Sequence, residues 1–402
     1  MAQNGLIAFK SEETSRKSMI CKQTPEEDQD NKQTMSKLFS PIKVGRMQLA
    51  HRLAMAPMTR FRADDDHVPL PMVTEYYEQR AAVPGTLLIT EATFISPRAG
   101  GYSNAPGIWN EAQIAQWRQV TDAVHAKGSY IYAQIWSLGR VANPDILERE
   151  GPFDLVSSSA VAASEQARVP RALTEDEIHA IIGDFAQAAR NAVAAGFDGV
   201  EIHGANGYLV DQFIQDTVNR RTDGWGGGVE QRARFALEVV RAVVDAIGAD
   251  RTGIRFSPWS TFQGMRMADP VPQFSYLARK TAELGLAYVH LVESQVTGGA
   301  DGESTDQLDF FLKAYGGAGP VVIAGGYQAD SARKAVDARY QDHEVVIGVG
   351  RPWTSNPDLP FRFKAGISLR PYEREVFYAP KDPRGYIDYG FSEEFKATQV
   401  AA

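Results

Sequence analysis

The sequence GVEIHGANGY at residues 199–208 joins an apolar strand to a loop that carries a histidine, an asparagine and a tyrosine. The first part, 199–204, is almost continuously apolar, as is typical of a parallel strand buried on both faces. The loop then brings two hydrogen-bond donors, His203 and Asn206, close to the phenol of Tyr208. An isolated histidine after a strand is more often a core residue than a ligand. The rest of the chain therefore decides the interpretation.

Seven further strand-like runs share this apolar pattern, and amphipathic helical patterns separate them. The runs lie at 52–57, 86–92, 129–136, 252–258, 288–293, 320–326 and 344–351. The helical patterns lie at 73–81, 111–127, 174–195, 230–247, 272–284, 306–314 and 329–339. Thr174 and Glu177 form a capping box at the start of the third helix. This α/β alternation predicts an eight-stranded parallel (β/α)8 TIM barrel rather than an open doubly wound sheet.

The two ends of the chain differ from the barrel in composition. Residues 1–36 are polar, charged and without periodicity, which predicts a disordered N-terminal tail. Two short strands at 41–49, around a Gly45-Arg46 turn, predict a β-hairpin that caps the N-terminal mouth of the barrel. The catalytic domain is expected to span 37–396, and a short C-terminal tail 397–402.

Composition restricts the partners and the compartment. The 402 residues carry 42 basic and 50 acidic side chains, a net charge of −8, with no basic cluster to attract nucleic acid or an anionic membrane. The apolar runs are too short to span a bilayer. Cys21 is the single cysteine, which excludes an intramolecular disulfide and an iron–sulfur centre. We expect a cytoplasmic monomer or homodimer, with no signal peptide, that acts on a small molecule.

Polar residues stand at nearly every expected strand end, where the active sites of such barrels lie. No strand ends in lysine, which disfavours a Schiff-base aldolase. Glu91, Glu293 and His203 could surround a divalent metal, but oxygen-rich metal sites usually have more acids, so we expect no metal. The last two strands end in Gly325-Gly326 and Gly350-Arg351, a pattern expected of a phosphate-binding site.

Several motifs, taken in order along the chain, resemble the old yellow enzyme family of FMN-dependent ene reductases. The resemblance covers roughly residues 38–395. The motifs are LFSPI at 38–42, MAPMTR at 55–60, AQIW at 133–136, the 203–208 loop, RARF at 232–235, GR at 350–351, SNPDL at 355–359 and GYIDY at 385–389. The family implies the predicted barrel with FMN bound at its C-terminal face, and NADPH or NADH as the hydride donor.

The resemblance also implies cofactor contacts. Thr59 would hydrogen-bond the flavin carbonyl near N5, Gln134 would bind the pyrimidine end, and Arg255 would stand beside the N1 and O2 edge, where its charge stabilises reduced flavin. The backbone of Pro57 and Met58 would pass along the ring. Gly325, Gly326, Gly350 and Arg351 would hold the phosphate, and Ala92 is also assigned to the cofactor site.

The substrate would be an enone or enal. By the same resemblance, His203 and Asn206 would donate hydrogen bonds to its carbonyl oxygen while hydride reaches the β carbon, and Tyr208 would protonate the α carbon. Trp136 and Tyr378 would line the substrate space, although both aromatic residues would serve equally well in packing.

One departure from the family, and two other functions, stay open at this point. Many relatives place a bulky aromatic where this chain has GGADG at 298–302, which predicts a more open lid. The same scaffold could run a flavin-dependent isomerisation, although Tyr208 favours net reduction. It could also serve as a non-catalytic flavin or ligand-binding barrel, for which a proton donor would be superfluous.

Overall fold

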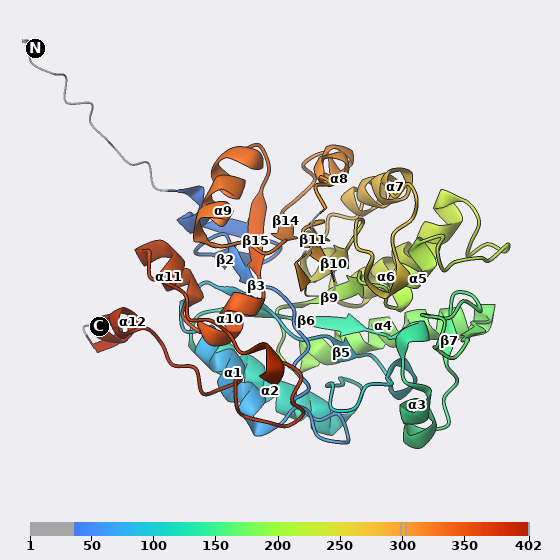
Figure 1. Cartoon of the computed structure of the whole chain (residues 1–402), viewed down its shortest axis with the longest axis horizontal. Helices are drawn as coiled ribbons and strands as arrows, with labels where there is room; N and C mark the ends of the chain where they lie inside the picture. Colours follow the sequence, from blue (N-terminus) through green and yellow to red (C-terminus); the bar gives the residue numbers. More distant parts are fainter. Residues whose placement is uncertain (1–35, 298–299, 302–303, 401–402) are drawn as a thin grey trace, which may run out of the picture. The chain divides into compact units, whose positions relative to one another are not determined.

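The computed structural model describes residues 36–297, 300–301 and 304–400, and it contains the predicted closed barrel (Figure 1). Eight parallel strands form the wall in the order in which they occur along the chain. They are β3 (Leu53–Met55), β4 (Leu87–Ile89), β6 (Tyr130–Trp136), β9 (Gly199–Gly204), β10 (Thr252–Phe256), β11 (Tyr288–Val292), β14 (Val321–Ala324) and β15 (Val345–Val349). The last strand pairs with the first, Ile347 opposite Leu53, so the sheet has no open edge there. The predicted fold is confirmed, with most strands shorter than the apolar runs that predicted them.

Helices surround the strands on the outside (Figure 1). They are α1 (Pro71–Arg80), α2 (Glu111–Ala126), α4 (Glu175–Ala194), α6 (Val229–Ile247), α7 (Val271–Ala282), α8 (Asp309–Tyr315) and α9 (Ala329–Lys334), which continues as a π-helical turn over Ala335–Arg339. Each corresponds to a predicted helix, and the Thr174–Glu177 capping box is present. Five further helices were not predicted: α3 (Pro144–Glu150), α5 (Leu209–Ile214), α10 (Arg351–Ser355), α11 (Leu359–Ala365) and α12 (Glu393–Val400).

The predicted hairpin is present as β1 (Ile42–Val44) and β2 (Met47–Leu49), joined antiparallel. Gly45 turns the chain with a φ of +54°, and a side chain there would collide with the carbonyl of Asp250. The apolar side chains of the hairpin pack against residues from the barrel strands, among them Ala54, Tyr132 and Tyr288. The hairpin therefore closes the end of the barrel opposite the strand ends that carry the polar residues.

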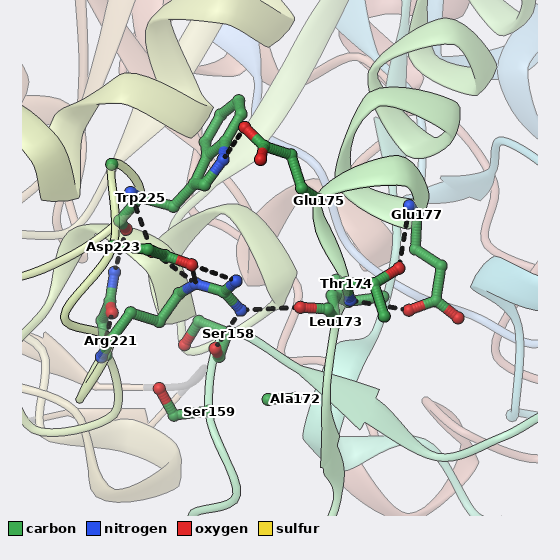
Figure 2. Close-up of polar contacts among 12 residues, drawn as sticks. Ser158, Ser159, Ala172, Leu173, Thr174, Glu175, Glu177, Arg221, Asp223 and Trp225 are labelled. Carbon is green, nitrogen blue, oxygen red and sulfur yellow. Dashed lines mark hydrogen bonds and ion pairs between the residues drawn. The ribbon is translucent and has the colours of Figure 1, made fainter.

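A long insertion follows β6, and Arg221 fastens it to the loop after α5 (Figure 2). The insertion contains β7 (Val156–Ser157), which pairs in parallel with β8 (Arg171–Ala172). The guanidinium of Arg221 donates to the carbonyl oxygens of Ser158 at 3.0 Å and Leu173 at 2.7 Å, and it also pairs with Asp223. The indole of Trp225 donates to Glu175 at the start of α4. Three separate segments are thus held together beside the barrel.

The C-terminal segment returns to the first strand. Arg60, 0% exposed, donates to the carbonyl oxygens of Phe377 at 3.1 Å and Gly385 at 2.7 Å. Arg62 donates to the carbonyl oxygens of Val376, Phe377 and Asp382. Two buried cations after β3 therefore secure a segment that follows them by more than three hundred residues.

Some predictions concern residues at the margins of the described structure. The predicted tail lies outside the described residues up to position 35, whereas Ser36 caps a short 3-10 helix over Lys37–Phe39. Helix α12 extends into the residues assigned to the C-terminal tail. Two further short strands occur near the rim, β5 (Thr93–Phe94) beside β6, and β12 (Val296–Thr297) paired with β13 (Ala300–Asp301). The open lid predicted over 298–302 falls largely outside the described residues. None of the described helices is both long and apolar enough to cross a bilayer.

Candidate active site

A cavity of about 760 Å³ lies at the predicted rim, within the range of small-molecule sites. Fourteen of the predicted site residues line it: Pro57, Met58, Thr59, Gln134, Trp136, His203, Asn206, Tyr208, Arg255, Gly325, Gly326, Gly350, Arg351 and Tyr378. Ala92 is not among the lining residues; it is buried in an apolar cluster with Phe94 and Trp136. The structure thus brings together predicted residues from six of the eight strand ends, and their roles stay predictions.

His203 presents a neutral imidazole to the cavity. Burial, with Arg255 and His290 nearby, holds the pKa of His203 well below its ordinary value. Its Nδ1 accepts a hydrogen bond from the backbone N–H of Ala205 at 3.4 Å, so the ring proton belongs on Nε2. The ring lies parallel to Trp136, with centroids 5.9 Å apart. His203 can therefore act as a hydrogen-bond donor with a fixed orientation.

Asn206 and Gly207 form the tight turn of the loop, with φ angles of +57° and +79°. The backbone N–H of Asn206 donates to Ser257 Oγ at 2.8 Å. The Asn206 Oδ1 atom is buried and has no hydrogen-bond partner among the described residues. Because a buried polar atom without a partner costs about 1–3 kcal/mol, this amide is suited to a bound molecule that completes its hydrogen bonds.

Tyr208 is enclosed by aromatic rings. Its ring contacts Trp136 edge-to-face at 4.6 Å and His203 at 4.8 Å. Burial, and secondarily the phenol of Tyr102, raises the pKa of Tyr208 above its ordinary value. The phenol therefore keeps its proton at neutral pH and can donate it to a group in the cavity that has become basic.

Arg255 supplies a positive charge to the same cavity. It is 9% exposed, and its side chain donates no hydrogen bond to another described residue. Burial lowers the pKa of Arg255, but a guanidinium stays charged at any physiological pH. On β6, Gln134 also lines the cavity and donates to Glu201 of the neighbouring strand β9 at 2.7 Å. An unpaired cation at this depth is suited to a ligand that carries or acquires negative charge.

Glycines shape the opposite end of the cavity. A Cβ atom on Gly325 would approach Glu293 Cβ within 2.7 Å, so no side chain fits there. Gly326 has a φ of +73°. Gly350 and Arg351 line the same part of the cavity, where the sequence predicts a phosphate-binding site.

The structure does not support the alternative of a metal between Glu91, Glu293 and His203. The Glu293 carboxylate accepts hydrogen bonds from Tyr327 at 2.6 Å and Tyr340 at 2.7 Å. Glu91 accepts from the backbone N–H of Arg60 at 3.0 Å, and burial raises its pKa to about 7. Within the described ranges, no three acidic, histidine or cysteine side chains are grouped so that they could hold a metal ion.

Sequence reasoning missed several residues that line the cavity. They are aromatic or basic and lie outside the strands and α-helices: Phe61, Tyr102, Phe262, Tyr372, Arg374 and Phe377. Phe61 packs against Tyr102 at 6.2 Å and Tyr378 at 5.9 Å, forming an aromatic wall. The PMTRF sequence after the first strand was the one signal that could have identified Phe61, because it directly follows predicted cofactor residues.

Comparisons with known proteins agree with this geometry. A sequence model of the NADH:flavin oxidoreductase / NADH oxidase family matches residues 37–370. The chain belongs to the old yellow enzyme family. It is 70% identical to a chanoclavine-I aldehyde reductase of Penicillium roqueforti over 92% of this chain and 100% of that protein. It is 54% identical to an NADP-dependent oxidoreductase of Aspergillus flavus, over 90% and 97% of the two chains.

The solved structures include an old yellow enzyme from Pichia sp. AKU4542 with a TM-score of 0.82 and 40% identity, covering 89% of this chain and 94% of that one. Membership in the family makes the protein an FMN-dependent oxidoreductase that uses NAD(P)H. The cavity fits such a cofactor, because it combines an unpaired guanidinium, Arg255, with the glycine turns at 325–326 and 350.

Proposed function

We propose that this old yellow enzyme family member reduces the activated C=C bond of an α,β-unsaturated carbonyl compound. The observation that carries the proposal is the 203–208 loop, which presents a neutral imidazole, an amide and a protonated phenol to one cavity. A site that only binds flavin has no need for a proton donor held in this way.

When bound in the cavity, FMN would supply the hydride, taken from NAD(P)H, for the β carbon of the alkene. His203 donates from Nε2 and Asn206 from its amide to the carbonyl oxygen of the substrate, which withdraws electron density from the β carbon. Tyr208 gives its proton to the α carbon and regains a proton from water.

An unsaturated aldehyde is the substrate class that we propose. This choice rests on the 70% identical relative, which is named for the reduction of chanoclavine-I aldehyde. That aldehyde is therefore the first compound to test, followed by simpler enals and enones. The proposed compartment is the cytoplasm, and the oligomeric state is expected to be a monomer or homodimer.

An anaerobic titration tests the proposal. NADPH should bleach the flavin absorbance of the purified holoenzyme, and one equivalent of the aldehyde should restore it, with the saturated aldehyde as product. Unchanged flavin colour on addition of NADPH would support a binding protein. Product of unchanged mass but shifted double-bond position would support an isomerase, and either result would overturn net reduction.

A further inference from the structure

Four polar side chains from adjacent strands meet inside the barrel: Gln134 of β6, Glu201 of β9, Arg255 of β10 and His290 of β11. Glu201 and His290 are both 0% exposed. The Glu201 carboxylate accepts hydrogen bonds from Gln134 Nε2 at 2.7 Å and from His290 Nδ1 at 2.8 Å. Because β10 separates β9 from β11, Glu201 and His290 reach each other across the barrel interior.

Strand β10 leaves room for this contact. The residue between Glu201 and Tyr288 in the sheet register is Gly253, which has no side chain. A Cβ atom on Gly253 would approach the Tyr288 ring within 2.7 Å. Two residues further along β10, Arg255 lies in register with both His203 and His290. The Glu201 carboxylate therefore lies further from the cavity than the Arg255 guanidinium, by two residues along the strands.

Glu201 is an anion at this position. Burial by itself would raise the pKa of Glu201, but His290, Arg255 and Gln134 together hold it below its ordinary value. His290 is neutral, because burial lowers its pKa. The permanent charges in the cluster are thus one negative, on Glu201, and one positive, on Arg255. Gln134 and His290 hold the carboxylate, while Arg255 makes no side-chain hydrogen bond to another described residue.

We propose that Glu201 is a positioning residue that acts through Arg255: its charge partly offsets the field of the guanidinium in the cavity and so keeps the reduction potential of bound FMN low. This inference rests on the proposed placement of Arg255 beside the flavin. Reduction adds negative charge at that edge, which Arg255 attracts and Glu201 repels. A low potential favours passing hydride on to the alkene over retaining it.

Two variants separate charge from shape. Glu201→Gln keeps the size of the side chain and removes its charge, whereas Glu201→Asp keeps the charge and changes the reach. The potential of FMN in each holoenzyme is measured anaerobically against a reference dye, with no alkene present. For two charges several ångström apart in a protein interior, removal of the anion should favour reduced over oxidised FMN on the order of tenfold. For a two-electron couple this is a rise of about 30 mV.

The Asp variant should stay near the parental potential. A merely structural role for Glu201 would instead shift both variants, or the Asp variant more. An unchanged potential in Glu201→Gln overturns the proposal. Glu201→Met provides a second uncharged variant. If both uncharged variants lose FMN while Glu201→Asp retains it, the proposal is also overturned, because removing a negative charge behind Arg255 should not weaken an anion-binding site.

The two proposals fail in different ways. A protein that never reduces an enal but shows the higher potential in Glu201→Gln contradicts the proposed function and supports the role of Glu201. A protein that reduces enals but shows no potential shift contradicts the role of Glu201 alone.

Discussion

At the scale of single residues, the proposed role of Tyr208 as proton donor can be tested by removing its phenolic oxygen alone. Its ring packs between Trp136 and His203, so removal of the oxygen leaves the walls of the cavity in place. Tyr102 is a second phenol in the same cavity, and burial raises its pKa as well. Tyr102→Phe therefore serves as a control, because it also removes a phenolic oxygen from the cavity and keeps the ring.

We expect Tyr208→Phe to slow reoxidation of the flavin by an enal by roughly 10² or more, the usual effect of losing a positioned general acid. Reduction by NADPH should stay close to the parental rate. Stopped-flow measurement of the two half-reactions checks this, with Tyr102→Phe as the matched control. Parental turnover in Tyr208→Phe would show that another group or water protonates the product.

At the scale of elements, α5 fixes the 203–208 loop, which carries the proposed catalytic residues. Asp211 accepts a hydrogen bond from the N–H of Gly207 at 2.9 Å, and Gln212 Nε2 donates to the carbonyl oxygen of the same glycine at 2.8 Å. Gln212 also bonds Leu138 and Ser157, which belong to the insertion after β6. The turn that carries Asn206 and Tyr208 is thus held by one short helix from both sides.

Gln212→Ala should lower turnover with an enal on the order of tenfold while the flavin spectrum stays near that of the parent. The expected reason is a small displacement of Asn206 and Tyr208, since misplacement by an ångström can cost up to about 10² in rate. Gln187→Ala, on the exposed face of α4, is the matched control. Parental kinetics in Gln212→Ala would show that the loop keeps its geometry without this clamp.

The sequence predicted the strands and helices that have a clear hydrophobic pattern within their own residues. Eight apolar runs and the helices between them identify the barrel, and polar residues at strand ends must converge in a closed sheet. Helix α5 was missed because its six residues are too few to show a helical period. Tyr372, Arg374 and Phe377 were missed because their place depends on the buried cations at 60 and 62, and arginine usually indicates a surface position.

At the scale of the whole molecule, stability should depend on buried groups with displaced pKa values. His51 is buried just before β3. Its Nδ1 accepts a hydrogen bond from the N–H of Leu53, and its Nε2 contacts Thr86 Oγ1 at 3.0 Å. Burial lowers the pKa of His51 to about 4. Glu91 and Asp211 act in the opposite sense, since burial raises the pKa of each to about 7.

The sign for His51 is fixed by its lowered pKa. The unfolded chain binds the proton below about pH 6.5 while the folded protein does not until about pH 4, so stability is present at neutral pH and lost as the pH falls. Between pH 7.5 and 5 this amounts to about 2 kcal/mol.

We expect urea unfolding at pH 7.5 and pH 5 to show a smaller fall in the free energy of unfolding for His51→Gln than for the parent. The two falls should differ by about 2 kcal/mol. Glu91 and Asp211 contribute equally to the pH dependence of stability in the parent and in the variant, so their contributions cancel. The exposed His179→Gln should behave like the parent, and an equal acid loss in His51→Gln would contradict the assignment.

The buried arginines after the first strand have a consequence for biosynthesis. Arg60 and Arg62 bind carbonyl oxygens near residues 376–385, and β3 pairs with β15. These partners are synthesised late. Neither the barrel nor the cavity can therefore be completed while the ribosome still holds the last quarter of the chain. During translation these guanidinium groups remain in water. The cavity for the flavin therefore cannot form until residues 345–385 have been synthesised and have left the ribosome.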